Sequence, residues 1–323
     1  MALRIVFFGT PEFAARSLDE LKMHFDVPLV VAQPDRPKGR GRALAAPPVK
    51  ERAFALGIPC LQVERPNAPG AIAALQKVEA DLFVVVAYGA ILSKELLAVP
   101  KLGAINLHAS LLPAFRGASP IQAAILAGLE ETGVTTMFMD EGLDTGDLLL
   151  QEKLSIGPDE TAGELSVRLA EEGAKLLSST VNQVGNGSPN RRPQDHARAT
   201  VTKKIRKADG RLDFAQPAKA IHDRARAMTP WPGAMAGFDG GLVRFERTRV
   251  AAGADPGAAP GAILGEGDHD GLLVACGTGS IEVLRVRPAG RNDMDARDWW
   301  RGLRSGKGSA PRFTTPSLDE ETP

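Results

Sequence analysis

The stretch Gly103-Ala-Ile-Asn-Leu-His-Ala-Ser-Leu-Leu-Pro-Ala-Phe-Arg-Gly117 decides the fold and the place to look for chemistry. An unbroken apolar run over residues 81–88 precedes it and is typical of a central parallel strand covered on both faces. Residues 105–108 then alternate apolar and polar, so Asn106 and His108 share one side of a strand. Open α/β sheets bind ligands beyond the ends of such strands, which favours a functional site here. The alternative is a buried histidine capped by an asparagine.

Length and composition indicate a globular protein of two domains, with 323 residues, 39 basic and 39 acidic side chains. Because the net charge is zero, an anionic partner must be met by local clusters of cations. The two cysteines, Cys60 and Cys276, lie far apart, and the five histidines show no ligand spacing, so we expect no metal and no disulfide. The N-terminal apolar run is too short for a signal peptide or a membrane span. We therefore expect a cytoplasmic protein that does not contact membranes.

The first part of the chain, residues 1–188, predicts an α/β domain. A strand-like run over residues 3–8, a helical pattern over 12–22 and a second strand over 27–32 form a βαβ opening. Such an opening favours a Rossmann-like open parallel sheet with right-handed crossovers. The turn after the first strand is Gly9-Thr-Pro11, which lacks the dinucleotide-binding glycine pattern. We therefore do not expect NAD or FAD.

The rest of the chain differs in composition and pattern. Residues 189–208 have the composition of a basic linker. Short strand-like runs separated by glycines follow, and they predict a small OB-like β-barrel over residues 209–310. Residues 311–323 are rich in Ser, Pro and Thr and are expected to form a disordered tail.

Positive charge is concentrated in two segments. The Pro- and Gly-rich segment 33–50 carries Arg36, Lys38, Arg40 and Arg42, and the linker carries Lys203, Lys204, Arg206 and Lys207. We expect the first segment to be a flexible basic loop between a strand and a helix. It is either a solvated loop or an arm that follows a phosphate backbone. Because the segment has no acidic residue after Asp35, the second interpretation is at least as well supported as the first.

Asp144 lies in a glycine-flanked loop, Glu141-Gly-Leu-Asp-Thr-Gly-Asp147, directly after a predicted strand. Because the loops after parallel strands gather at one edge, Asp144 is expected near His108. A carboxylate and an imidazole can manage a proton, and Asn106 with His108 can hold an oxyanion, so the three suit attack on a carbonyl. An Asx-turn role for Asp144 is about equally compatible with the pattern. A hydrolase built on Ser110 is disfavoured, because no nucleophile elbow is present.

Several motifs together resemble the folate-dependent formyltransferase family. They are Asn106-Leu-His108, Ser110-Leu-Leu-Pro113, Arg116-Gly117, Pro120-Ile-Gln122 and the Asp140–Asp147 loop. The basic segment at 33–42, the strand over 84–89 and Pro230-Trp-Pro-Gly233 narrow the resemblance to the members that act on methionyl-tRNA. The resemblance runs from about Leu3 to Pro288. The linker near Lys203 departs from the family pattern, since it lacks the usual aromatic and acidic residues, and Met-Thr precedes Pro230 where Phe-Asn is usual.

The resemblance implies a formyltransferase fold, with transfer of the formyl group of 10-formyltetrahydrofolate to the amino group of methionine on initiator tRNA, for translation initiation. It implies that Asn106, His108 and Asp144 are catalytic. It implies that folate contacts Ser110, Leu111, Leu112 and Pro113, and the backbone near Tyr88 and Gly89. It also implies that both basic segments contact tRNA, Arg42 foremost. We further expect a monomer without a metal.

Three rival functions stay open on the sequence. One is formylation of a nucleotide-linked amino sugar, for which a basic arm has little use. Another is a hydrolase that frees formate from the folate, which would not need the C-terminal domain. The third is an RNA-binding module without catalysis, against which the retained Asn106, His108 and Asp144 argue.

Overall fold

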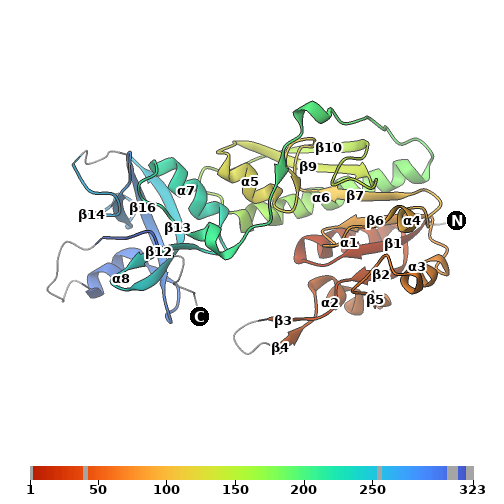
Figure 1. Ribbon diagram of the computed structural model, residues 1–323, viewed down its shortest axis with the longest axis horizontal. Helices are drawn as coiled ribbons and strands as arrows, with labels where there is room; N and C mark the ends of the chain where they lie inside the picture. Colours follow the sequence, from red (N-terminus) through yellow and green to blue (C-terminus); the bar gives the residue numbers. More distant parts are fainter. Residues whose placement is uncertain (1–2, 39–42, 253–256, 304–311, 318–323) are drawn as a thin grey trace. The chain divides into compact units, whose positions relative to one another are not determined.

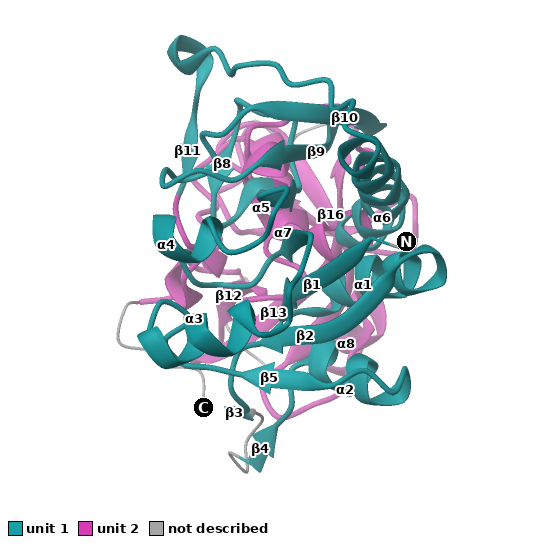
Figure 2. Ribbon diagram, turned by 90° about the vertical axis from the view of Figure 1, so that its right-hand side faces the viewer, with its two compact units in different colours: residues 1–120, 131–155, 166–202 teal, residues 121–130, 156–165, 203–323 magenta. Residues whose placement is uncertain are grey.

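The computed structural model describes residues 3–38, 43–252, 257–303 and 312–317 (Figure 1). The chain divides into two compact units (Figure 2). The first comprises Met1–Pro120, Glu131–Ser155 and Ser166–Thr202, and the second comprises Ile121–Glu130, Ile156–Leu165 and Lys203–Pro323. None of the helices in the described ranges is long and apolar enough to cross a membrane.

The first unit is built on a seven-stranded sheet with the order β10-β9-β7-β6-β1-β2-β5. Its strands are β1 (Arg4–Gly9), β2 (Asp26–Ala32), β5 (Cys60–Gln62), β6 (Leu82–Val86), β7 (Ala104–His108), β9 (Glu131–Phe138) and β10 (Leu148–Ser155). The five strands from β5 to β7 run parallel, as the βαβ pattern predicts. However, β9 runs antiparallel to β7, and β10 antiparallel to β9, so the sheet is parallel only in part.

Helices cover both faces of this sheet. They are α1 (Glu12–His24), α2 (Pro48–Ala55), α3 (Pro69–Gln76), α4 (Lys94–Leu97) and α6 (Ala162–Gly185), the last of which begins in the second unit. Figure 2 shows α1 and α2 on one side of β1, β2 and β5, with α3 and α4 on the other. Every second residue of β1 faces α3 and α4, where Val6 and Phe8 are fully buried. Burying one such side chain contributes about 1.5–3 kcal/mol.

The described parts of the basic segment after β2 are two paired strands, where the composition predicts a flexible loop. Strands β3 (Arg36–Lys38) and β4 (Ala43–Ala45) pair antiparallel, and Arg40 and Arg42 lie outside the described residues. Within the described ranges the pair has no other neighbouring strand, so proline at position 37 removes no bond from a larger sheet there. Asp35 anchors the base, because its carboxylate accepts hydrogen bonds from Lys50 Nζ at 2.9 Å and Gln62 Nε2 at 2.7 Å. These two bonds hold the pKa of Asp35 below its ordinary value.

The second unit is built on an antiparallel sheet with the order β12-β13-β16-β15-β14. Its strands are β12 (Ala234–Phe238), β13 (Gly241–Ala251), β14 (Ile263–Glu266), β15 (Leu272–Ala275), β16 (Ser280–Pro288) and β17 (Met294–Asp295), the last paired with β16. Helices α7 (Ala218–Ala227) and α8 (Ala296–Leu303) pack on it, and α5 (Pro120–Leu126) joins the units in sequence. Helix α8 was not expected from the sequence pattern, and its Trp299 and Trp300 lie in the core.

Residues 312–317 correct the expectation of a disordered tail over 311–323. Thr314 bridges Gly237 on β12, and Arg312 bridges Ala262 beside β14, so this segment connects the two edges of the sheet. Between them Phe313 is 1% exposed and lies 4.9 Å from the Phe245 ring. The segment is ordered despite its polar composition, because the free energy gained by burying one aromatic side chain outweighs the entropy lost in ordering a few exposed neighbours.

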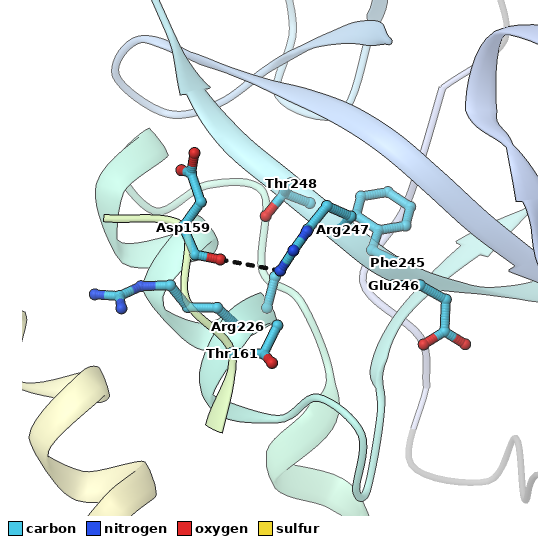
Figure 3. A pocket seen from close by; sticks show the side chains of 8 residues that line it. Asp159, Thr161, Arg226, Phe245, Glu246, Arg247 and Thr248 are labelled. Atoms are coloured by element: carbon cyan, nitrogen blue, oxygen red, sulfur yellow. Dashed lines mark hydrogen bonds between the residues drawn. The ribbon is translucent and has the colours of Figure 1, made fainter. Parts of the chain in front are cut away.

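Ion pairs line a small hollow in the second unit, which Figure 3 shows from close by. Arg247 on β13 donates to the carbonyl oxygen of Asp159 at 3.3 Å and forms two hydrogen bonds of 2.8 and 2.9 Å with Glu164. The guanidinium of Arg247 lowers the pKa of Glu164 to about 2. These contacts hold Arg247 against Asp159 and Glu164, which indicates a structural role.

Candidate active site

Asn106 and His108 lie on β7, between β6 and β9, and share one side of the strand. Asn106 is 8% exposed and His108 is 6% exposed. The other side of β7 carries Leu107, which packs on α6 beside Gly173. Among the described residues, the Asn106 carboxamide has no hydrogen-bond partner, although it is nearly buried. It therefore retains two donors for a molecule bound beside β7.

Two neighbours determine the orientation of the His108 ring. Its Nε2 atom lies 2.9 Å from the carbonyl oxygen of Phe115, and its Nδ1 atom lies 3.6 Å from Asp144 Oδ2. A carbonyl oxygen can only accept, so Nε2 carries a proton. In the neutral ring Nδ1 is then the basic nitrogen, and it faces the carboxylate that would stabilise the cation formed when it takes a proton.

The structure brings Asp144 beside His108, but by a different route from the one expected. Strand β9 is antiparallel and ends at Phe138, opposite Ile105 near the start of β7, so it does not deliver its loop to the edge where His108 lies. The loop instead folds back, and Asp144 adopts a positive φ of 54°, a region that Asp tolerates better than most residues. The backbone N–H of Gly117 donates to Asp144 Oδ2 at 2.7 Å and fixes the carboxylate.

Gln194, which sequence reasoning missed, holds this loop in place. Its Nε2 atom donates to the carbonyl oxygens of Asp144 at 2.9 Å and Gly146 at 2.8 Å. Its Oε1 atom accepts from Arg116 Nη2 at 2.6 Å, and Arg116 is 6% exposed. The sequence gives the loop around Arg116 a fixed charge, but this guanidinium is committed to Gln194 and His196. A lone glutamine in a linker carries no pattern that would have revealed its role.

The segment Ser110–Pro113 is held against β9 and β10. The Ser110 hydroxyl donates to the carbonyl oxygen of Ala114 at 2.6 Å and is fully buried, so it is not placed as a nucleophile. Leu112 is fixed from both sides, because its N–H donates to Thr135 Oγ1 at 3.1 Å and its carbonyl oxygen accepts from Gln151 Nε2 at 2.9 Å. The segment therefore forms a rigid border next to His108.

Tyr88 and Gly89 follow β6, and the Tyr88 side chain points into the core. It is 2% exposed, it meets the Phe8 ring edge-on at 5.4 Å, and burial raises the pKa of its hydroxyl to about 12. Its carbonyl oxygen accepts a hydrogen bond of 2.8 Å from Thr10 Oγ1. Any contact of this residue with a ligand must therefore be made by backbone atoms. Gly89 has a φ of +88°, which suits glycine.

The predicted RNA-contacting residues are divided between the two units. Arg36 is exposed on β3 in the first unit, and Lys203, Lys204, Arg206 and Lys207 are exposed in the second. Lys38 lies in β3, and Arg40 and Arg42 fall outside the described ranges. No cluster of His, Cys, Asp and Glu suited to a metal ion occurs in the part of the chain that the structure describes.

Comparison with known proteins identifies relatives along the whole chain. The formyl transferase family model matches residues 3–181, and the model of the formyl transferase C-terminal domain matches residues 204–304. The chain is 46% identical to a methionyl-tRNA formyltransferase of Symbiobacterium thermophilum over 99% of this chain and 98% of that protein. It is 45% identical to one of Myxococcus xanthus, over 95% and 97% of the two chains.

Solved structures share the fold. A sugar 3N-formyl transferase, WlaRD, crystallised with dTDP and 5-N-formyl-THF, aligns with a TM-score of 0.65 at 17% identity, over 90% of this chain and all of that one. An N-formyltransferase from Helicobacter canadensis, in complex with folinic acid and dTDP-3-aminofucose, aligns with a TM-score of 0.64 at 19% identity, over 88% and 99%. The family models and the full-length identities together show that the chain is an enzyme of the formyl transferase family, within the methionyl-tRNA formyltransferases.

Proposed function

We propose that this chain transfers the formyl group of 10-formyltetrahydrofolate to the amino group of methionyl-tRNA, giving formylmethionyl-tRNA for translation initiation in the cytoplasm. The observation that carries the proposal is the meeting of Asn106, His108 and Asp144 beside β7, with His108 Nδ1 3.6 Å from Asp144 Oδ2. Identity of 46% over nearly the full length to a protein of that name supports the same substrates. No metal is required by this chemistry.

The reaction needs a base and an oxyanion stabiliser. The neutral methionine amine attacks the formyl carbon, a new C–N bond forms, and the bond from that carbon to N10 breaks. The amine loses a proton and N10 gains one, so protons balance without an external reagent. The formyl carbon is amide-like and weakly electrophilic, so stabilising the tetrahedral oxyanion should contribute most to the rate.

The geometry suggests a role for each of the three side chains. The unpartnered carboxamide of Asn106 is free to donate to the oxyanion. His108 takes the amine proton at Nδ1, while its Nε2–H remains bonded to Phe115. Asp144 keeps the ring oriented and stabilises the imidazolium ion that results, as a positioned carboxylate does for other catalytic histidines.

Folate and tRNA are assigned to different residues of the chain. We assign the folate to the border formed by Ser110, Leu111, Leu112 and Pro113, and to the backbone of Tyr88 and Gly89. We assign the tRNA phosphates to two sets of cations. These are Arg36, Lys38, Arg40 and Arg42 in the hairpin segment, and Lys203, Lys204, Arg206 and Lys207 in the linker. The division of labour is a catalytic domain over 1–188, a basic linker over 189–208 and a tRNA-binding domain from 209, in a monomer.

One assay tests the proposal against its rivals. Purified chain is incubated with 10-formyltetrahydrofolate and, in parallel, methionyl-tRNA, free methionine, a dTDP-linked amino sugar or no acceptor. We expect formylmethionine only with methionyl-tRNA, and a KM for tRNA that rises steeply with salt while the KM for folate does not. Formylation of the sugar, release of formate without acceptor, or indifference of the tRNA KM to salt would contradict the proposal.

A further inference from the structure

Trp231 is an exposed aromatic side chain that the proposed chemistry does not use. Its side chain is 54% exposed, whereas the other two tryptophans, Trp299 and Trp300, are 7% and 8% exposed. An exposed indole leaves a large apolar surface in contact with water, so its presence in an ordered turn calls for an explanation. It lies between α7 and β12, within the second unit.

The turn that carries Trp231 is held from both ends. The carbonyl oxygen of Pro230 accepts from Arg244 Nη2 at 2.7 Å, and the N–H of Gly233 donates to the carbonyl oxygen of Met228 at 2.8 Å. Gly233 has a φ of +96°, and a Cβ atom there would lie 2.3 Å from Arg244 Nε. The indole is therefore presented to solvent by a fixed backbone.

A basic segment lies directly against this turn. The segment from Lys203 to Gly210 contacts the turn at its last residue. A Cβ atom added to Gly210 would lie 3.1 Å from Pro232 Cγ and 2.1 Å from the carbonyl oxygen of Gly233. Lys203, Lys204 and Lys207 in this segment are exposed. None of these three lysines has a carboxylate within ion-pair distance in the part of the chain that the structure describes. The turn with the exposed indole is thus in contact with the C-terminal end of a segment that carries unpaired cations.

We propose that Trp231 is a stacking site for an unpaired base of the RNA substrate, with the lysines of the 203–210 segment contacting its phosphates. Proteins bind single strands by this combination, because every base has a π-face and every nucleotide a negative charge. The charge of the lysines selects a polyanion over a second protein or a membrane-like apolar surface. The inference rests on the proposed function and adds a base contact that the two predicted sets of cations do not supply.

Intrinsic fluorescence of the full-length chain tests the site, because only one of its three tryptophans is exposed. Binding of uncharged initiator tRNA is predicted to quench the emission, and a blunt RNA duplex is predicted not to. Trp231→Ala should weaken tRNA binding about 5- to 100-fold without changing the slope of affinity against salt. Trp231→Phe, which keeps an aromatic face and guards against misfolding of the alanine variant, should bind within about threefold of wild type. Val250→Ala, at an exposed site on β13, is the matched control.

Substitution of the lysines should change the salt dependence of tRNA binding and not the tryptophan quench, the opposite of Trp231→Ala. Changing Lys203 and Lys204 to Ala should lower the salt slope by about 1 to 2 and leave the tryptophan quench in place. Equal tRNA affinity of wild type and Trp231→Ala, or quenching by the duplex alone, would overturn the inference. Quenching without formylmethionine formation would support the stacking site and contradict the proposed function. Formylation with an unchanged tRNA KM in Trp231→Ala would do the reverse.

Discussion

The Nε2 atom of His108 lies 2.9 Å from the carbonyl oxygen of Phe115, two residues after the Ser110–Pro113 segment that borders the site. This contact places a proton on Nε2 and leaves Nδ1 as the nitrogen that can exchange protons with a substrate. Nδ1 also faces Asp144. The ring therefore has a structural contact at Nε2, to Phe115, and a proton-accepting atom at Nδ1, beside Asp144. The two functions can be separated by substitution.

His108→Gln should retain the hydrogen bond to Phe115 and lose the nitrogen that accepts a proton. The glutamine amide can donate to the Phe115 carbonyl oxygen, but it has no nitrogen that accepts a proton near neutral pH. We expect kcat for formyl transfer to fall about 10²- to 10⁴-fold with little change in the folate KM or the unfolding temperature. His24→Gln, at an exposed position on α1, is the control. A kcat within threefold of wild type would exclude proton transfer by His108.

Gln194→Ala should impair the site from a distance. It removes two hydrogen bonds to the Asp144 loop and leaves the buried Arg116 guanidinium without its closest acceptor. An unsatisfied buried group costs about 1–3 kcal/mol, and more when it is charged. We expect a lower free energy of unfolding in urea together with a lower kcat, and neither change in Gln76→Ala on the surface of α3. Full activity in Gln194→Ala would show that the loop is held by other contacts.

Acid should weaken the second unit through Glu164. Arg247 lowers the pKa of Glu164 to about 2 from an ordinary value near 4.5, so the folded state binds fewer protons than the unfolded state in that window. The stabilisation is therefore complete above about pH 4.5 and is lost as the pH falls towards 2. In Glu164→Gln, the free energy of unfolding should decline less between pH 4.5 and 2 than in wild type. Glu12→Gln changes the net charge equally, and the same flattening in that variant would refute a specific role for the pair.

Phe313 should contribute more stability than its place near the chain end suggests. It fills the interior of the second unit between Phe214, Phe238, Phe245 and Trp299. Phe313→Ala should lower the free energy of unfolding by about 3–5 kcal/mol, the usual cost of a cavity left by an aromatic residue. Arg312→Ala, whose side chain is exposed, should cost far less. Equal effects of the two substitutions in urea unfolding would contradict the packing seen here.

Much of the site could be predicted from local patterns. Alternation over residues 105–108 places Asn106 and His108 on one side of a strand, because a period of two is a property of the strand itself. The proximity of Asp144 was also predicted, although the assumed parallel strand was wrong. The connection from β7 to β9, residues 109–130, contains one helix, the seven-residue α5 of about 10 Å, and does not return to the edge where β7 begins. Strand β9 therefore starts at the edge where β7 ends and runs antiparallel.

The features that were not predicted depend on single side chains with distant partners. Gln194 bonds to the carbonyl oxygen of Asp144, 50 residues away, and no periodicity marks such a contact. Phe313 sits in a segment whose Ser, Pro and Thr content is typical of disorder, and one buried ring reverses that expectation. The hairpin of β3 and β4 is anchored by Asp35 to Lys50 and Gln62, which its glycine-rich sequence does not reveal.

The central claim is that Asp144, held beside His108, takes part in formyl transfer, and a matched pair of variants tests it most directly. Asp140 lies in the same loop, but its carboxylate accepts from Gly142 and Thr145 within the loop. In Asp144→Asn, the single-turnover rate of formyl transfer from 10-formyltetrahydrofolate to methionyl-tRNA should fall at least about 100-fold below the wild-type rate. Asp140→Asn should react at nearly the wild-type rate. Equal rates in the two variants, or no formylmethionine from the wild-type chain, would contradict the account.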